Sequence, residues 1–160
     1  MPYPSNIDAT LHIGKATTDP LPEGTADSYE EVPWTGSIQP PTFTINVAYF
    51  NVTNNNARHS IGGKLADQSV TGNVVLDWDA EVVKAMFADI NSGGGVKRNW
   101  YLKYPTGDRF LSFRGFLSAW EEEAFDAGDE AKEHRANFTI SVDGAVTVAD
   151  VAPGSDGWTP

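Results

Sequence analysis

Residues 119–138, which read AWEEEAFDAGDEAKEHRANF, hold seven acidic residues and two basic ones. Glu121, Glu122 and Glu123 are consecutive, and Asp126 follows them. Two carboxylates placed on either side of a glycosidic bond are sufficient for acid–base hydrolysis. The sequence does not give the separation between these groups, however, and a run of glutamates is usually a solvated face. The cluster alone therefore does not predict a catalytic site.

The other residue types that commonly do chemistry are sparse. His12, His59 and His134 are isolated from one another, and none stands at the spacing of paired metal ligands. The chain has no cysteine, which excludes disulfides and thiolate metal sites. Residues 77–81, DWDAE, lack the glycine and the later glutamate of a calcium loop, and helix capping explains them more simply. We therefore expect no catalytic residue, no cofactor and no metal, and a protein that is not an enzyme.

Composition and charge exclude several classes of partner. The chain has 160 residues, which suits one domain over 1–160, and its formal net charge is −11. That charge disfavours a nucleic-acid binder, which needs cations to displace the counterions of phosphates, and disfavours binding to an anionic membrane. The N-terminal residues do not resemble a signal peptide, and no apolar run is long enough to cross a bilayer. We expect a protein made in the cytoplasm.

One segment, about residues 80–91, has the periodicity of a helix. Five apolar residues fall on a single stripe of that helix: Val82, Val83, Met86, Phe87 and Ile90. Asp79 is the expected N-cap, and Gly93 to Gly95 are expected to end the helix. A helix this short is marginal in isolation, so it must pack on a sheet.

The remaining patterned segments read as β-strands. They are expected at 9–17, 43–53, 70–78, 99–104, 109–120, 137–142 and 145–148. The dipeptide Asp143-Gly144 lies between the last two and predicts a tight hairpin. Pro105 and Thr106 predict a second one.

Three segments are expected to lie outside the strands: a mobile arm at about 18–31, a long loop at about 54–69 and a frayed tail at about 151–160. The predicted fold class is mostly β (α+β). It is an antiparallel β-sandwich or rolled barrel with one flanking helix, because sequential strands are joined by short turns.

The serial order of these features resembles the major tail tube proteins of long, non-contractile-tailed bacteriophages. The likeness covers roughly residues 9–149, and it lies in the order of the following segments: ATLHIGKAT, YEEVPWTGSIQPPTFTINVAYFNVT, ARHSIGGKLADQ, VTGNVVLDWD, EVVKAMFADINSGG, RNWYLKYPTGDRFLSFRGFLSAWE and NFTISVDGAVTV. Segments 18–31 and 121–135 are longer than that family's pattern.

This resemblance implies a subunit of homohexameric rings that stack into a tube. It implies as partners further copies of the chain, a tape measure protein, a tail terminator and tail-tip or baseplate proteins. The long loop would stack the rings through Arg58, Ile61, Lys64, Leu65 and Asp67. Apolar residues on both faces of strands would pack between subunits, namely Phe50, Phe113 and Leu117. The finished protein would reside in the tail of a virion.

In such a tube the acidic segment has two readings that the sequence leaves open. Double-stranded DNA would pass through the lumen without specific binding, and a negative wall would repel it over about 8 Å at physiological salt. Glu121, Glu122, Glu123 and Asp126 could line that lumen or its rim, or they could form an outer solvated loop.

Other functional classes also fit the composition. A monomeric carbohydrate-binding or adhesin-type β-sandwich could use the tryptophans as a stacking platform, although it does not account for the serial order of the segments. A tail terminator or the tube protein of a contractile tail shares much of the expected architecture.

Overall fold

The computed structural model describes residues 9–17, 26–33, 37–51, 58–93, 95–105, 109–125, 134–151 and 153–156. Eleven strands and one helix lie within these ranges. The strands are β1 (Thr10–Gly14), β2 (Ser28–Glu31), β3 (Ile38–Gln39), β4 (Ile45–Asn51), β5 (Arg58–Leu65), β6 (Ser69–Val75), β7 (Lys97–Lys103), β8 (Phe110–Glu122), β9 (Arg135–Val142), β10 (Thr147–Ala149) and β11 (Ser155–Asp156). The helix α1 spans Glu81–Asn91, as its periodicity predicts. No helix in the described ranges is long and apolar enough to span a membrane.

Nine of these strands form one sheet. Its order is β11-β2-β1-β7-β8-β9-β6-β3, with β10 also paired to β8. All of its pairs are antiparallel except β11 with β2. The prediction of a mostly antiparallel fold with one helix is confirmed, but the described strands do not close into a barrel.

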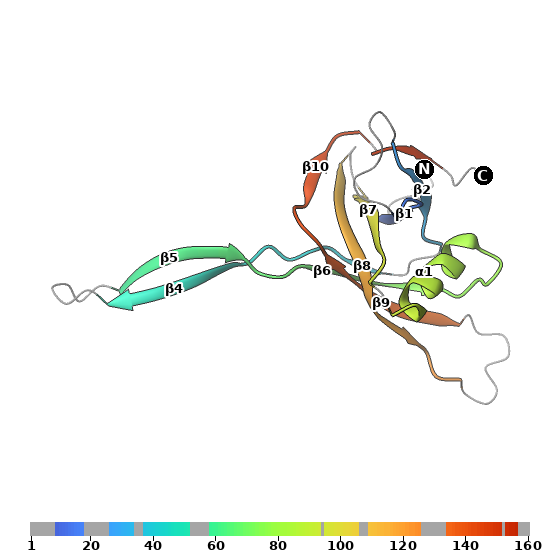
Figure 1. Cartoon of the computed structure of the whole chain (residues 1–160), viewed down its shortest axis with the longest axis horizontal. Helices are drawn as coiled ribbons and strands as arrows, with labels where there is room; N and C mark the ends of the chain where they lie inside the picture. The colour runs from blue at the N-terminus through green and yellow to red at the C-terminus, as the bar shows by residue number, and fades with distance from the viewer. Residues whose placement is uncertain are drawn as a thin grey trace, which may run out of the picture.

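The helix covers one face of this sheet and forms the main core with it (Figure 1). Alternate residues of the central strands point to that face, and Trp100, Phe138 and Ile140 are among the most buried side chains. Val82, Val83 and Met86 meet them from the helix. A smaller cluster of Tyr29, Tyr101 and Phe110 lies apart from this core.

The strand β8 is long, and a bulge divides it. Phe113 and Leu117 lie in the main core with exposed fractions of 4% and 5%. The pairing with β9 shifts between Leu117 and Ala119. The prediction that Phe113 and Leu117 pack between subunits is therefore wrong. The chain's own helix buries the face of the strand on which both residues lie.

The dipeptide Asp143-Gly144 does not form the predicted hairpin. β9 pairs with β8 up to Val142, opposite Gly115, and β10 resumes along β8 with Thr147 opposite Ser112. The two strands therefore follow the same edge of β8, separated by an irregular excursion. Gly144 adopts a positive φ of 92° there, as expected of a turn, but the turn interrupts one edge of β8 and does not join two paired strands.

The helix termini agree with the prediction in part. The N-cap is Ala80 and makes no side-chain capping bond, so the prediction of Asp79 is wrong. Asp77 instead accepts a hydrogen bond from the Asp79 N–H at 3.1 Å, which forms a turn before the helix. Gly93 and Gly95 both have positive φ and end the helix as expected.

Three predicted loops contain strands. β2 occupies the end of the expected mobile arm and pairs with β1, and β11 in the expected tail pairs with β2. β5 fills most of the expected loop at 54–69, and β6 begins at its last residue. Within these three segments, residues 18–25, 54–57, 152 and 157–160 lie outside the described residues.

Candidate assembly interface

The strands β4 and β5 form a separate two-stranded sheet that extends away from the body of the molecule (Figure 1). We call this element, residues 43–51 and 58–65, the projecting hairpin. At its base the Ala66 N–H donates to the Thr44 carbonyl at 2.6 Å. An isolated two-stranded hairpin is at best marginally stable in water, so this element needs a further packing partner.

The projecting hairpin exposes an unusual number of large apolar side chains. Their exposed fractions run from 45% to 60%, and they are Phe43, Ile45, Val47, Tyr49, Phe50, Ile61 and Leu65. Single exposed apolar residues are ordinary on a protein surface, but a contiguous group marks an interaction site. The hairpin is therefore the leading candidate for an interface.

A β-bulge distributes these residues over both faces of the hairpin. Ile45 lies opposite Leu65, whereas Val47 lies opposite Gly62, so β5 holds one extra residue between these pairs. Residues directly opposite each other share a face, so Leu65 lies with Ile45 and Val47. Ile61 lies opposite Ala48 and therefore belongs to the other face. Apolar residues on both faces are typical of strands that are covered on both sides.

The predicted ring-stacking residues fall on this hairpin or beside it. Ile61 and Leu65 are exposed on β5, Arg58 and Lys64 belong to the same strand, and Asp67 is exposed just after it. Phe50, predicted to pack between subunits, is on β4 with 45% exposure. The structure thus gathers these residues on one element, although that element is a strand pair and not a loop.

The charge of the hairpin region differs from that of the rest of the chain. Between Glu31 and Asp67 there is no acidic residue, while Arg58 and Lys64 contribute positive charge. The whole chain carries a formal charge of −11. The apolar hairpin therefore has a net positive formal charge, in contrast to the acidic chain as a whole.

A second apolar surface lies where α1 meets the end of β8. Trp78 contacts Phe87 edge-to-face with 5.4 Å between ring centroids, and Phe87 contacts Trp120 at 6.3 Å. Trp78 is 45% exposed and Phe87 is 38% exposed. Phe125, just beyond β8, is 84% exposed. We call Trp78, Phe87, Trp120 and Phe125 the aromatic patch.

Carboxylates lie within the aromatic patch and at its margin. Glu122 accepts a hydrogen bond from the Trp120 indole N–H at 3.4 Å and lies 3.7 Å from Nε2 of His134. The His134 ring stacks on Phe125 with 4.3 Å between centroids. Asp77 and Asp79 are exposed on either side of Trp78. The patch is thus apolar at its centre and negative at its margin.

The predicted acidic residues do not act as one group. Glu121 lies opposite Asn137, and Glu122 lies opposite the buried Ala136 on the helix-covered face. Since neighbouring strand residues point to opposite faces, Glu121 is on the face without the helix. Glu123 follows the end of β8, and its N–H donates to the Arg135 carbonyl at 2.9 Å. Asp126 lies outside the described residues.

Sequence reasoning missed the aromatic patch because of Phe87. That residue belongs to the helix stripe expected to face the sheet, but it is exposed while Asp89 is buried. A buried aspartate is unexpected in an amphipathic helix. The apolar periodicity therefore does not indicate that the helix is rotated about its axis so that Asp89 is buried and Phe87 is exposed. Trp78 is 45% exposed, which favours a place at an interface.

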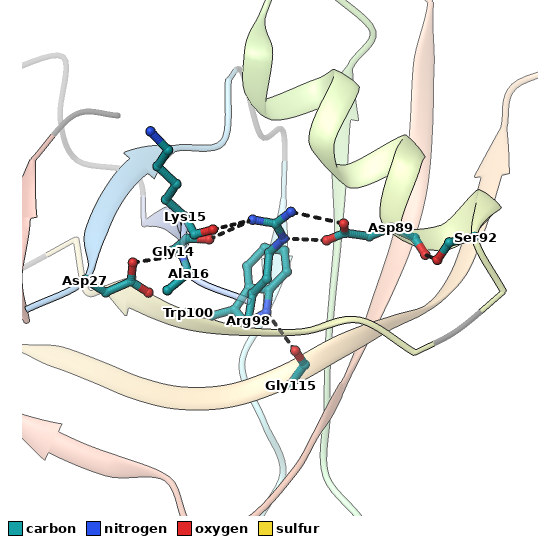
Figure 2. Close-up of polar contacts among 9 residues, drawn as sticks. All are labelled: Gly14, Lys15, Ala16, Asp27, Asp89, Ser92, Arg98, Trp100 and Gly115. Carbon is teal, nitrogen blue, oxygen red and sulfur yellow. Dashed lines mark hydrogen bonds and ion pairs between the residues drawn. The ribbon is translucent and has the colours of Figure 1, made fainter. Parts of the chain in front are cut away.

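A buried ion pair explains why α1 takes this orientation (Figure 2). The guanidinium of Arg98 on β7 donates to both carboxylate oxygens of Asp89. Its Nη1 also donates to the carbonyls of Gly14 and Lys15 at 3.2 and 3.0 Å. Paired in this way, the two charges fix the helix against β7 and the end of β1. Phe87 lies two residues before Asp89, on the opposite side of the helix, and is consequently directed toward solvent.

Asp27 organises the neighbouring edge of the sheet. Its carboxylate accepts hydrogen bonds from the Ala16 and Ser28 N–H groups and from the Asn99 side-chain amide, all at 2.9 to 3.0 Å. Burial, and to a lesser extent the Asp27 charge, raises the pKa of Tyr29 from 10.0 to about 12. No group of three or more metal-ligating side chains occurs in the part of the chain that the structure describes.

Comparison with known proteins finds likeness in structure alone. The sequence matches no protein-family model and no curated protein. A chain of the sheath–tube complex of an extracellular contractile injection system superposes with a TM-score of 0.64 at 14% identity, covering 89% of this chain and 88% of that chain. A chain from the tail of an empty gene transfer agent particle, with C6 symmetry, superposes with a TM-score of 0.62 at 13% identity. The match covers 87% of this chain and 95% of that chain.

A third neighbour is a chain of the anti-feeding prophage baseplate, with a TM-score of 0.67 at 7% identity, covering 88% of this chain and 91% of that chain. These structures come from contractile systems and a gene transfer agent. The fold is thus common to several phage-like tails and does not point to non-contractile phages in particular. The chain has a tail-tube-like fold.

Proposed function

We propose that this chain is a structural subunit of a phage-like tail tube. Copies form homohexameric rings, and the rings stack into a tube. The observation that carries the proposal is the projecting hairpin: it exposes seven large apolar side chains on a fold otherwise found in tube and baseplate assemblies. Such a hairpin is unfavourable in a monomer, because the hairpin exposes both apolar side chains and unprotected strand edges to water.

Within the tube we assign ring stacking to the projecting hairpin, through Ile61 and Leu65 with Arg58, Lys64 and Asp67 beside them. Phe50 packs between subunits on the same hairpin. The described strands also leave the nine-stranded sheet open at β11 and β3. Neighbouring subunits could pair at these open edges and so continue the sheet around a ring.

The tube serves as an electronegative conduit for genome ejection. Each subunit carries −11, so every ring is strongly anionic and repels a DNA duplex instead of binding it. Glu121 is the best candidate for the lumen wall, because it lies on the sheet face without the helix. Replacing Glu121, Glu122 and Glu123 with Lys should slow ejection, and an unchanged ejection rate in assembled particles would remove the lumen assignment.

The protein is made in the host cytoplasm and functions in the virion tail. Its other partners are a tape measure protein, a tail terminator and tail-tip or baseplate proteins. A terminator role or a contractile-tail tube role shares this architecture, and the structural neighbours include both kinds of assembly. The non-contractile tail remains our specific proposal, from the sequence resemblance.

The rival is a monomeric carbohydrate-binding module that uses the aromatic patch as a stacking surface. Light scattering over a range of protein concentrations separates the two. A tube subunit should grow in mass with concentration, whereas the rival should remain a monomer and bind a glycan array. A monomer that stays discrete with tail-tip proteins present, and binds glycans, would overturn the proposal.

A further inference from the structure

The molecule carries two exposed apolar surfaces of opposite electrostatic character. The projecting hairpin has no acidic residue and holds Arg58 and Lys64 in its sequence. The aromatic patch contains Glu122 and is flanked by Asp77 and Asp79. Surfaces that match in apolar character and oppose in charge are the ordinary basis of a specific interface.

The projecting hairpin and the aromatic patch of one molecule cannot contact each other. Figure 1 shows the projecting hairpin and α1 on opposite sides of the nine-stranded sheet. A contact between them must therefore join two copies of the chain. Such a contact uses different surfaces on the two partners, and interfaces of this kind propagate into rings or open-ended fibres instead of closing into dimers.

We infer that the projecting hairpin of one copy docks on the aromatic patch of a second copy. The inference rests on the proposed function and deepens it, because it names the surface that receives the hairpin. Ile61 and its apolar neighbours would cover Phe87 and Phe125, and the cations of β5 would meet the carboxylates at the margin. The occupant is a second copy because the chain itself supplies both complementary surfaces: an apolar hairpin with two cations and no carboxylate, and an aromatic patch bordered by carboxylates.

The geometry of the patch suits an extended partner. Its rings are joined by successive contacts, since Trp78 contacts Phe87 and Phe87 contacts Trp120. Beyond Trp120 the contacts continue through Glu122 and His134 to Phe125. A succession of rings interrupted by a carboxylate complements a β-strand whose apolar residues alternate with polar or charged ones.

Because the chain has no cysteine, single introduced thiols can test the contact directly. Ile61→Cys labels the hairpin, Phe125→Cys labels the patch, and Val151→Cys is the matched control, being 76% exposed outside both surfaces. Concentrated mixtures are treated with a short bis-maleimide. The Ile61→Cys and Phe125→Cys mixture should give several-fold more mixed covalent dimer than the Ile61→Cys and Val151→Cys mixture.

Electron micrographs of the same samples separate this inference from the proposed function. Rings or tubes without excess Ile61–Phe125 dimers would overturn the docking and leave the proposed function intact. Excess dimers would support the docking, whatever the length of the assemblies. If neither assemblies nor excess dimers form, even with tail-tip proteins added, both the docking and the proposed function are overturned.

A reciprocal charge exchange provides a second test. Arg58→Glu with Lys64→Glu should reduce assembly, measured as light scattering at fixed concentration. Adding Asp79→Lys and Glu122→Lys to those changes should restore part of the scattering, since the charges are again opposite. No recovery, with all variants folded by circular dichroism, would contradict the docking.

Discussion

Asp89 on α1 and Arg98 on β7 form a buried, two-point ion pair, with exposed side-chain fractions of 9% and 11%. The pair joins the helix to β7 and, because Arg98 also donates to the carbonyls of Gly14 and Lys15, to the end of β1. It therefore links the orientation of the helix to the exposure of the aromatic patch.

Removing one member of this pair should be costly. Asp89→Ala leaves the Arg98 charge buried without its carboxylate, and we expect a loss of about 3–5 kcal/mol in the free energy of unfolding. Glu81→Ala is the control, because its pair with Lys84 is exposed and worth at most about 1 kcal/mol. Urea titrations measure both, and equal losses would contradict the structural role of the buried pair.

The tyrosine at the sheet edge should make stability fall at high pH. The folded pKa of Tyr29, about 12, lies above the unfolded value of 10.0. Folding therefore favours the neutral phenol, and its contribution is complete below pH 10 and lost as pH rises toward 12. Tyr29→Phe has no ionisable group, so the difference in urea midpoint between wild type and variant should shift across this range. A constant difference from pH 9 to 12 would argue against the raised pKa.

Substitution by alanine at two strand glycines, Gly62 on β5 and Gly115 on β8, should change the stability of the protein to different extents. A Cβ on Gly115 would lie 2.5 Å from the Ser141 carbonyl oxygen and 3.0 Å from Ile140, whereas one on Gly62 would meet only Ile45, at 3.9 Å. We expect Gly115→Ala to cost about 1–3 kcal/mol because β8 and β9 must separate. Gly62→Ala should change stability by about 0.5 kcal/mol or less. Thermal unfolding of the two variants makes the comparison, and a larger loss at Gly62 would contradict the packing of β8 on β9.

Charges placed on the projecting hairpin should separate folding from assembly. Ile61→Asp with Leu65→Asp alters side chains that are 58% and 48% exposed, so the monomer should stay within about 0.5 kcal/mol of wild type. Long tubes should nevertheless fail to form, because the apolar contacts between rings are lost. Val151→Asp, also at an exposed apolar residue, should assemble normally. Tubes of normal length from the double variant would show that the hairpin does not stack rings.

Local patterns in the sequence were sufficient to predict much of the fold. The helix is found as predicted at Glu81–Asn91, and the expected strands appear in β1, β4, β6, β7, β8 and β9. These predictions succeed because amphipathic periodicity reports burial against a core. They fail for β5, where Gly62, Gly63 and polar neighbours give no apolar alternation although the strand pairs with β4 on both sides of a bulge.

The site was harder to predict because it depends on tertiary geometry. Phe113 and Leu117 looked like interface residues, since apolar side chains appear on both faces of β8, but both lie in the core that the sheet forms with α1. The exposure of Phe87 follows from the Asp89–Arg98 pair, which joins residues whose attraction no periodicity reveals. Ile61 and Leu65, which we expect to stack rings, are exposed, and their separation onto two faces depends on a bulge that the sequence pattern does not reveal.

Negative-stain electron microscopy of the concentrated, purified protein, alone and with tail-tip proteins as initiator, tests the central claim most directly. We predict hollow tubes or rings whose end-on class averages have sixfold symmetry. Discrete monomers under both conditions, or closed dimers in which the projecting hairpin pairs with itself, would contradict the account.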